Sequence, residues 1–466
     1  MSVATLPQSA GATAQVAAFA SAADRRRDPA TRDALRRLVV DTVGVTVAGL
    51  ATEPVTLLHG WLTDEDRGTG DPSGAAVWGT PRMIGPADAA LLNGTAAHVL
   101  DWDDAAPSMA MHPAAVLLPT LFALAARRRI TGAQLDDAYC TGSAVFRAVS
   151  EILPHATHYG RGWHNTSTTG RLAATAAGAD LLGLTPLQTQ HALGIAASHA
   201  AGSLANFGTM TKPLHAGTAA RDAVMAVGLA ARGFTANPDQ LESRGGFLDL
   251  FGDHDPERAS TLRDRLDHWS TAWTGDYAIK AYPSCFATQR AIDAGISLRE
   301  EIGSAGIERI EVTLEAGGTR PLRDELPTTG LEAKFSLEYT LARALVSGDV
   351  LLADFADDAL AHPGVAELMP RITLTERPAS SEPGHTVVRL HTVDGRLLTR
   401  TVHHSRGDSH NPLSSGELFS KFRQCVGGDA AEATRWFDAL HALPDSDAPC
   451  DVQPLLAGPG GTAPTR

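Results

Sequence analysis

The segment Ala173-Ala-Thr-Ala-Ala-Gly178 lies within a long region rich in alanine and leucine, which runs from about residue 31 to residue 232. Apolar residues recur there at helical spacing, and glycine or proline marks the breaks. Seams of small residues such as this one allow helices to pack closely. The sequence therefore predicts an all-helical domain over residues 1–269, with helices at 86–100, 113–128, 135–152, 169–182, 186–200 and 215–231.

The pattern changes after residue 269. Residues 307–315, Ile-Glu-Arg-Ile-Glu-Val-Thr-Leu-Glu, alternate apolar and polar side chains, as a half-buried strand does. Similar alternation predicts strands at 372–376, 385–391 and 396–403, the last two joined by the turn Val393-Asp-Gly395, with helices at 335–346 and 354–361. We expect a smaller α+β domain over residues 270–405.

Helical spacing returns near the end of the chain, at 415–426 and 430–443. These helices predict that residues 406–455 rejoin the first domain. The last segment, 456–466, is rich in glycine and proline and is expected to be a disordered tail. The predicted fold class is mainly α, with a large all-helical domain and a smaller α+β domain.

Composition excludes several classes of function. The 466 residues carry a formal net charge of −14, which argues against a nucleic-acid partner. No apolar run approaches the roughly 18 residues of a membrane span, and residues 1–23 lack the basic start of a signal peptide, so a cytoplasmic protein without a membrane partner is expected. The four cysteines show no Cys-x-x-Cys spacing that would indicate zinc or an iron–sulfur cluster.

Lysine occurs only four times, at positions 212, 280, 334 and 421, against 35 arginines (39 − 4). Because arginine serves almost every surface position in this chain, a retained lysine indicates a site that needs a compact ammonium group. Lys212 stands three residues before His215, so both would share one helix face. Lys280 is followed by Ser284 and Cys285 in a second segment that we expect to meet the first between the domains.

The densest polar cluster is His98-Val-Leu-Asp-Trp-Asp-Asp104, followed by His112. If the helix continues, His98, Asp101 and Asp104 lie on one face and can supply an acid and a base. One alternative is helix capping by an Asp of the cluster. Another is a divalent metal site like that of helical terpene synthases, which is disfavoured because only 5% of residues are aromatic and no second metal motif follows.

These segments together resemble the MmgE/PrpD family, which includes 2-methylcitrate dehydratase, cis-aconitate decarboxylase and iminodisuccinate epimerase. The resemblance spans nearly the whole chain in order, and the segments that carry it are 92–104, His112-Pro113, Gly162-Trp-His164, 211–217, Gly245-Gly-Phe247, 280–285 and Lys334-Phe-Ser-Leu337. It implies a helical domain built from both ends of the chain, an inserted α+β lid, a homodimer and catalysis without metal or organic cofactor.

The resemblance also implies site residues. Those matching the family's pocket are Asp101, His112, His164, Lys212, Lys280 and Tyr339. We expect Lys212 and Lys280 to anchor a small carboxylate substrate, and His112, oriented by Asp101, to act as base or acid with His164 or Tyr339 as its partner. His215, Ser284, Cys285 and Asp104 are further candidates for substrate binding.

The chain departs from the decarboxylase pattern at Ala105 and Cys285, and Gln289 stands where many members of the family carry a histidine. Because a Cys at the position of Cys285 is common in the broader family, the resemblance favours other reactions of the family over decarboxylation, and we predict elimination of water from a β-hydroxy acid of the 2-methylcitrate type, a di- or tricarboxylate. Epimerisation or isomerisation and decarboxylation of a related polycarboxylate are the alternatives among enzymes. A non-catalytic helical binding protein is the alternative from another class.

Overall fold

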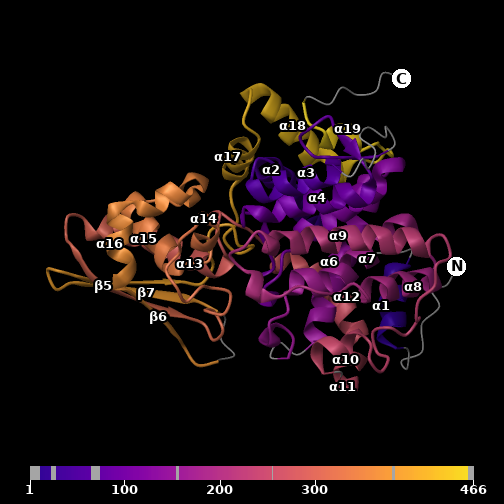
Figure 1. Ribbon diagram of the computed structural model, residues 1–466, viewed down its shortest axis with the longest axis horizontal. Coiled ribbons are helices and arrows are strands. Elements are labelled where there is room, and N and C mark those ends of the chain that lie inside the picture. Colours follow the sequence, from indigo (N-terminus) through magenta and orange to yellow (C-terminus); the bar gives the residue numbers. More distant parts are fainter. Residues whose placement is uncertain are drawn as a thin grey trace.

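The computed structural model describes residues 11–22, 28–64, 74–153, 157–253, 255–379 and 384–459. Figure 1 shows a large helical body and, beside it, a smaller body that contains a sheet. Each body has its own hydrophobic core. The expected mainly α class is confirmed, whereas the inserted α+β lid and the boundaries at 269/270 and 405/406 stay predictions.

The helical body contains every helix predicted before residue 269, with ends shifted by up to four residues. Local capping explains one of these shifts, because Thr131 and Gln134 form a capping box that starts its helix at Gly132. The helices are α1 (Ala12–Ala20), α2 (Pro29–Gly49), α3 (Glu53–Asp64), α4 (Pro86–Val99), α5 (Ala114–Leu124), α6 (Gly132–Ile152), α7 (Asn165–Leu182), α8 (Pro186–Ala197), α9 (Thr211–Ala230), α10 (Phe247–Gly252), α11 (Pro256–Ser260) and α12 (Leu262–Ala272). Strands β1 (Ala75–Ala76) and β2 (Met83–Ile84) form a short hairpin beside them.

Helices α4 and α9 cross at a pair of glycines. A Cβ atom on Gly217 would lie 2.3 Å from the Leu91 carbonyl oxygen and 2.2 Å from Thr95 Oγ1, and one on Gly94 would lie 3.0 Å from the Gly217 Cα. Only glycine allows backbones to approach so closely. The crossing brings the C-terminal end of α4 to the N-terminal end of α9, where Lys212 lies.

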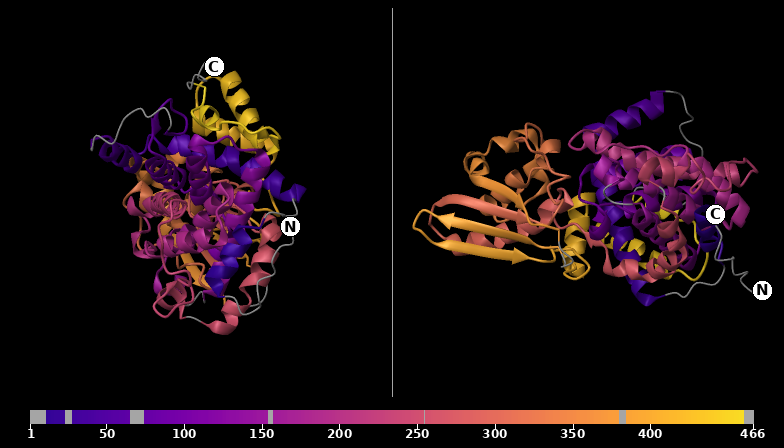
Figure 2. Two further views of the ribbon diagram at one scale, coloured as in Figure 1. Left: turned by 90° about the vertical axis from the view of Figure 1, so that its right-hand side faces the viewer. Right: turned by 90° about the horizontal axis from the view of Figure 1, so that it is seen from below.

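The smaller body is a four-stranded sheet covered by helices on one face, as Figures 1 and 2 show. The strand order is β6-β5-β7-β8, with β5 parallel to β6 and the other pairs antiparallel. Its elements are α13 (Phe286–Ile302), β5 (Ile307–Leu314), α14 (Gly330–Ala333), α15 (Leu337–Ser347), α16 (Pro363–Leu368), β6 (Ile372–Glu376), β7 (Thr386–Thr392) and β8 (Leu397–Val402). All predicted strands are confirmed.

Two helical features of this body differ from expectation. Residues 354–361, predicted as an α-helix, instead form parts of two short 3₁₀ helices, Leu352–Phe355 and Asp357–Ala361. Helix α13, which packs against β7, β8 and α15, was not predicted. Charged residues, among them Arg290, Asp293 and Arg299, lie between the apolar residues of this helix. They make the helical spacing of the apolar residues hard to recognise in the sequence.

The C-terminal helices pack against the helical body, while the domain bounds 406–455 stay a prediction. Helices α17 (Ser415–Val426) and α18 (Ala430–Ala442) pack against α2, and α19 (Gln453–Leu456) follows them. The expected disorder from residue 456 is wrong at its start, because Leu456 and Ala457 are buried in the core. Residues 460–466 of that predicted tail lie outside the described residues.

In the described part of the chain, no single helix is long and apolar enough to cross a membrane. Helices α2 and α3 reach that length and composition only when taken together, and they are bent by 80° at their junction.

A short two-stranded pairing joins two segments of the site, the one that follows α4 and the one that leads to Lys280. Strand β3 (Asp104–Ala105) follows the end of α4 and pairs antiparallel with β4 (Ala278–Ile279), directly before Lys280. The indole nitrogen of Trp102 donates to the Ala281 carbonyl at 3.0 Å. Residues that are almost 180 positions apart in the sequence are thereby held together.

Candidate active site

The site is built around residues 100–104, which we call the Asp101 loop. Helix α4 ends at Val99, and Asp101 has a left-handed backbone with φ of 53°. This conformation is costly for a residue other than glycine and is characteristic of functional sites. The predicted continuous helical stripe of His98, Asp101 and Asp104 is therefore wrong, because the turn separates their directions.

Both predicted anchoring lysines bind Asp101. The ammonium of Lys212 donates to Asp101 Oδ2 at 2.6 Å. That of Lys280 bonds to Asp101 Oδ1 and lies 3.0 Å from the Asp101 carbonyl oxygen and 3.4 Å from Asp103 Oδ1. All of these side chains are buried. Burial alone would raise the pKa of Asp101, but the two ammonium groups lower it below its ordinary value, so the carboxylate is ionised.

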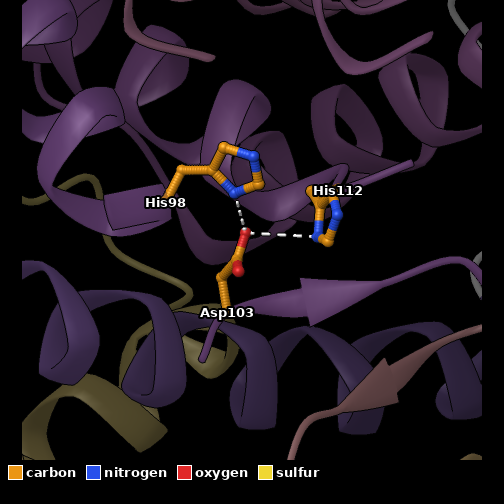
Figure 3. A group of neighbouring side chains, drawn as sticks. All are labelled: His98, Asp103 and His112. Carbon is orange, nitrogen blue, oxygen red and sulfur yellow. Dashed lines mark hydrogen bonds and ion pairs between the residues drawn. The ribbon is translucent and has the colours of Figure 1, made fainter. Parts of the chain in front are cut away.

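Asp103 holds two imidazoles on one carboxylate oxygen (Figure 3). Its Oδ2 lies 2.6 Å from His98 Nδ1 and 3.3 Å from His112 Nδ1. His112 Nδ1 also lies 2.6 Å from the Asp104 carbonyl oxygen. It is therefore Asp103, and not Asp101 as expected, that orients His112, because the left-handed turn commits Asp101 to the lysines.

These contacts fix the tautomer of His112. A carbonyl oxygen and a carboxylate only accept hydrogen bonds, so the proton of the neutral ring lies on Nδ1. Nε2 then carries the lone pair. Burial lowers the pKa of His112, against the opposing effect of Asp103, so the ring is neutral at physiological pH. The resting His112 is consequently a proton acceptor.

The same three side chains, His98, Asp103 and His112, lie close enough together to hold a metal ion. Their geometry nevertheless fits hydrogen bonding better. The bond from His112 Nδ1 to a backbone carbonyl requires a proton on that nitrogen, and a protonated nitrogen cannot ligate a metal. The expectation of a metal-free site stays a prediction.

His164 and His215 form a second imidazole pair. Their Nδ1 atoms are 3.1 Å apart, so one donates to the other. His164 precedes the first residue of α7, and His215 lies one turn after Lys212 on α9. Burial, followed by the charge of Lys212, lowers the pKa of His215 to about 4, and burial also lowers the pKa of His164. Both rings are therefore neutral.

A cavity of about 430 Å³ opens between the two bodies at this cluster. Among the described residues, its walls combine side chains of the helical body with others from the smaller body. They are Asp101, Ala105, Ala106, Pro107, Ser108, Ala110, Met111, His112, Tyr159, His164, Phe207, Lys212, Cys285, Phe286, Ala287, Glu315, Ala316, Gly317, Gly318, Pro321 and Phe335. The Lys212 and Lys280 segments thus meet beside His112, but Lys280 and His215 themselves do not line the cavity among the described residues, so the structure does not place either of them against a substrate there as expected.

The remaining predicted residues divide into two groups. Cys285 lines the cavity, and burial raises the pKa of its thiol to about 11, so it is protonated. Within the described structure, Ser284 and Tyr339 do not line the cavity. The Ser284 hydroxyl lies 2.8 Å from Thr288 Oγ1, and the Tyr339 hydroxyl donates to the Asp354 carbonyl, so neither is placed to meet a ligand there.

Asp104 does not reach the cavity either. Both of its carboxylate oxygens accept from the Ala114 amide at 3.0 Å, at the start of α5. The capping alternative therefore describes Asp104 better than substrate binding does. Burial, reinforced by the charge of Asp103, raises the pKa of Asp104 to about 8.

We expect Asp104→Asn to remove part of the pH dependence of stability. The folded protein holds a proton on Asp104 up to about pH 8, whereas the unfolded chain releases it near the ordinary value of 3.8. The stabilisation is complete below about pH 4 and is lost as the pH rises towards 8, at up to about 1.4 kcal/mol per pH unit. Denaturant unfolding near pH 5 and near pH 8 should show a smaller loss for the variant, and equal losses would contradict this account.

The two departures from the decarboxylase pattern and the unusual Gln289 also lie in different places. Ala105 and Cys285 line the cavity, where they alter the shape and polarity available to a ligand. Gln289 is buried elsewhere, with its amide nitrogen donating to the carbonyls of Tyr282 at 3.0 Å and Ser284 at 3.2 Å. Only the first two can affect the substrate directly.

Sequence reasoning missed several residues of the site. Asp103 was visible in the polar cluster, but its role depends on a turn that helical spacing does not reveal. Phe207 and Phe335 flank the Lys212 ammonium, with ring centroids 5.6 Å and 5.4 Å from Nζ. Glu315 lines the cavity directly after β5, although its place in the alternating pattern indicates only a strand.

Two profile matches decide the family. Residues 14–259 match the MmgE/PrpD N-terminal domain, and residues 282–441 match the MmgE/PrpD C-terminal domain. The chain belongs to the MmgE/PrpD family. The two matched segments correspond to the helical body and to the smaller body with part of the C-terminal return.

Similar members of the MmgE/PrpD family include cis-aconitate decarboxylases. The one from Mus musculus is 29% identical over 404 residues, covering 83% of this chain and 81% of the relative. The one from Homo sapiens is 28% identical and covers 88% and 85%, and the one from Aspergillus terreus is 27% identical and covers 83% and 84%.

Proposed function

We propose that this protein is a lyase acting on a small carboxylate, and that it removes a proton next to a carboxylate and then eliminates water from a β-hydroxy acid. The family and the decarboxylase relatives support a carboxylate-acting lyase. The finer assignment to dehydration of a 2-methylcitrate-type substrate rests on the site geometry. Catalysis without a cofactor, a homodimer and a cytoplasmic location stay predictions.

The observation that carries the proposal is the state of His112. Its Nδ1 is committed to Asp103 and the Asp104 carbonyl, which leaves Nε2 as the available lone pair on a ring that lines the cavity. A neutral imidazole in this tautomer accepts a proton from a substrate carbon. Decarboxylation instead needs a proton donor at the carbon that loses carbon dioxide, so a resting base favours elimination.

Lys212 supports the charge that proton removal creates. It lines the same cavity, and one of its neighbours is the carboxylate of Asp101, which Lys280 also neutralises. Because Lys280 also binds the Asp101 carboxylate, Lys212 does not neutralise it alone and can act on an anionic ligand in the cavity. A substrate carboxylate beside Lys212 becomes enediolate-like when the neighbouring proton leaves, and a fixed cation in a buried site stabilises that charge.

The hydroxide that leaves needs a proton. His164 and Cys285 line the cavity together with His112, and the Cys285 thiol is protonated. We assign delivery of this proton to His164: its ring N–H proton goes to the leaving hydroxide, and His215, as the donor in the hydrogen bond between the two rings, supplies a proton to the His164 ring in its place. The proton that His112 took from carbon returns to the His164–His215 pair when the site resets, so no net proton is gained or lost. Tyr339, the other expected partner, lies away from the cavity and is not included.

Decarboxylation is the second candidate, because the three relatives described above are cis-aconitate decarboxylases. It would start from protonated His112, which delivers its proton to the carbon. Epimerisation shares the first step with elimination but has no leaving group.

One experiment separates these reactions. Purified protein is incubated in deuterated water with 2-methylcitrate, citrate or cis-aconitate, and products are followed by mass spectrometry. Loss of water from the substrate supports the proposal, and release of carbon dioxide supports the second candidate. A substrate that takes up deuterium but loses neither water nor carbon dioxide indicates epimerisation. The rate should be the same with and without a chelator, and no turnover of any carboxylate would refute a lyase.

A further inference from the structure

Each of the four lysines of the chain bonds to a residue of the Asp101 loop. Lys212 and Lys280 bond to the Asp101 carboxylate, as described above. Lys334 and Lys421 take no part in the proposed reaction. Their ammonium groups donate to backbone carbonyls of the loop. A residue type that is rare in this sequence is therefore concentrated on one short segment.

Lys334 approaches the loop from the smaller body, at the junction of α14 and α15. Its ammonium donates to the Leu100 carbonyl at 2.7 Å and to the Pro283 carbonyl at 2.9 Å, and it lies 4.4 Å from the ring centroid of Phe355. Burial lowers the pKa of Lys334 to about 7. A neutral amine still has two N–H groups for the two carbonyls, so the contacts persist in either state.

Lys421 approaches from the C-terminal return, on α17. Its ammonium donates to the Trp102 carbonyl at 2.6 Å and to the Lys280 carbonyl at 3.0 Å, and it pairs with Asp41 of α2 at 2.6 Å. One side chain thus joins both segments that carry the Asp101–Lys280 pair. Its own charge is balanced by the buried Asp41.

The loop needs such support for two reasons. Leu100 caps the end of α4, where carbonyls have no partners within the helix, and both Leu100 and Trp102 are buried residues whose carbonyls need donors. The left-handed backbone of Asp101 is also strained, and such strain persists only when the surroundings determine the conformation. Lys334 and Lys421 supply donors on either side of this residue in the sequence.

We infer that Lys334 and Lys421 are positioning residues, which hold the backbone of the Asp101 loop so that Asp101 and Lys280 stand correctly beside the cavity. They do not themselves line the cavity among the described residues. Their kinetic effect rests on the proposed function, but their effect on the loop does not. A merely structural role would lower the stability of the fold and leave the rate per folded molecule unchanged.

The test compares Lys334→Met and Lys421→Met with the wild type and with Arg343→Met. Arg343 is the matched control, because it is buried in the smaller body, pairs with Asp354 and has no contact with the loop among the described interactions. Methionine keeps the apolar stem of lysine and removes the donors. Hydrogen exchange of the peptide covering 98–106 and steady-state kinetics are measured on the folded proteins.

Both lysine variants should exchange this peptide faster than the wild type. They should also lose kcat by about 10²-fold, the typical cost of a displacement of about 1 Å at a reacting centre, while KM changes little. The kcat/KM profile should shift in pH, since Lys280 and Asp103 would move relative to His112. Arg343→Met should leave the exchange of 98–106 and the pH profile as in the wild type.

Wild-type exchange in 98–106 together with wild-type kcat in both variants would overturn the inference. If the wild type turns over no carboxylate, the proposed function fails, and the exchange measurement alone still decides the role of the lysines. If the methionine variants do not fold, Lys334→Gln and Lys421→Gln replace them. These amides keep one polar group in place but are too short to reach both carbonyls, so the same results are expected.

Discussion

Replacing His112 with asparagine should lower kcat by about 10²- to 10⁴-fold, the usual contribution of a general base. The asparagine amide can still donate to the Asp104 carbonyl in place of Nδ1, which lies 2.6 Å from it in the wild type. What the variant loses is the Nε2 lone pair. Circular dichroism should show an unchanged fold, and steady-state assays on the substrate found by the screen measure the loss.

The matched control is His98→Asn, which removes the other imidazole bound to Asp103. His98 is buried and does not line the cavity in the described structure, so its loss should affect stability more than kcat.

Burial lowers the pKa of His112, and the active form is unprotonated, so wild-type kcat/KM should fall as the pH drops through that lowered pKa. Near-normal kcat in His112→Asn would remove the base from the mechanism.

Much of the fold could be predicted because its signals are local. The alternation of residues 307–315 gave strand β5 directly, and the glycines and prolines that separate the helical runs gave the main helices. Helix α13 escaped because charged residues interrupt its apolar face. The 3₁₀ helices near residue 355 escaped because short apolar runs do not distinguish them from a turn of α-helix.

The sequence could predict which residues belong to the site, from their type and their rarity, but not which contacts they make. The scarcity of lysine pointed to Lys212 and Lys280, and the structure places both on Asp101. The exchange of roles between Asp101 and Asp103 could not be foreseen, because it follows from one left-handed residue after α4. The roles of Lys334 and Lys421 depend on packing between segments that are far apart in the sequence.

Replacing Lys212 with methionine should reduce kcat/KM by about 10²- to 10³-fold, comparable to the loss of one donor to a developing oxyanion. Lys212 is the lysine that lines the cavity among the described residues, so its loss removes the cation nearest to a bound carboxylate. The fold should survive, because Asp101 keeps its bonds to Lys280 and is not left as an unpaired buried charge. Thermal unfolding and substrate titration measure the two effects separately.

The control for this variant is Arg221→Met, which removes a partly exposed cation from the same helix at its pair with Asp222. A general electrostatic effect of α9 on an anionic substrate would weaken both variants alike, whereas anchoring at the cavity affects only Lys212→Met. Because the ammonium acts on charge that grows during proton removal, kcat should fall as well as binding. A Lys212→Met protein with full activity would show that the carboxylate is held elsewhere, and the proton next to it would then lie outside the reach argued for His112.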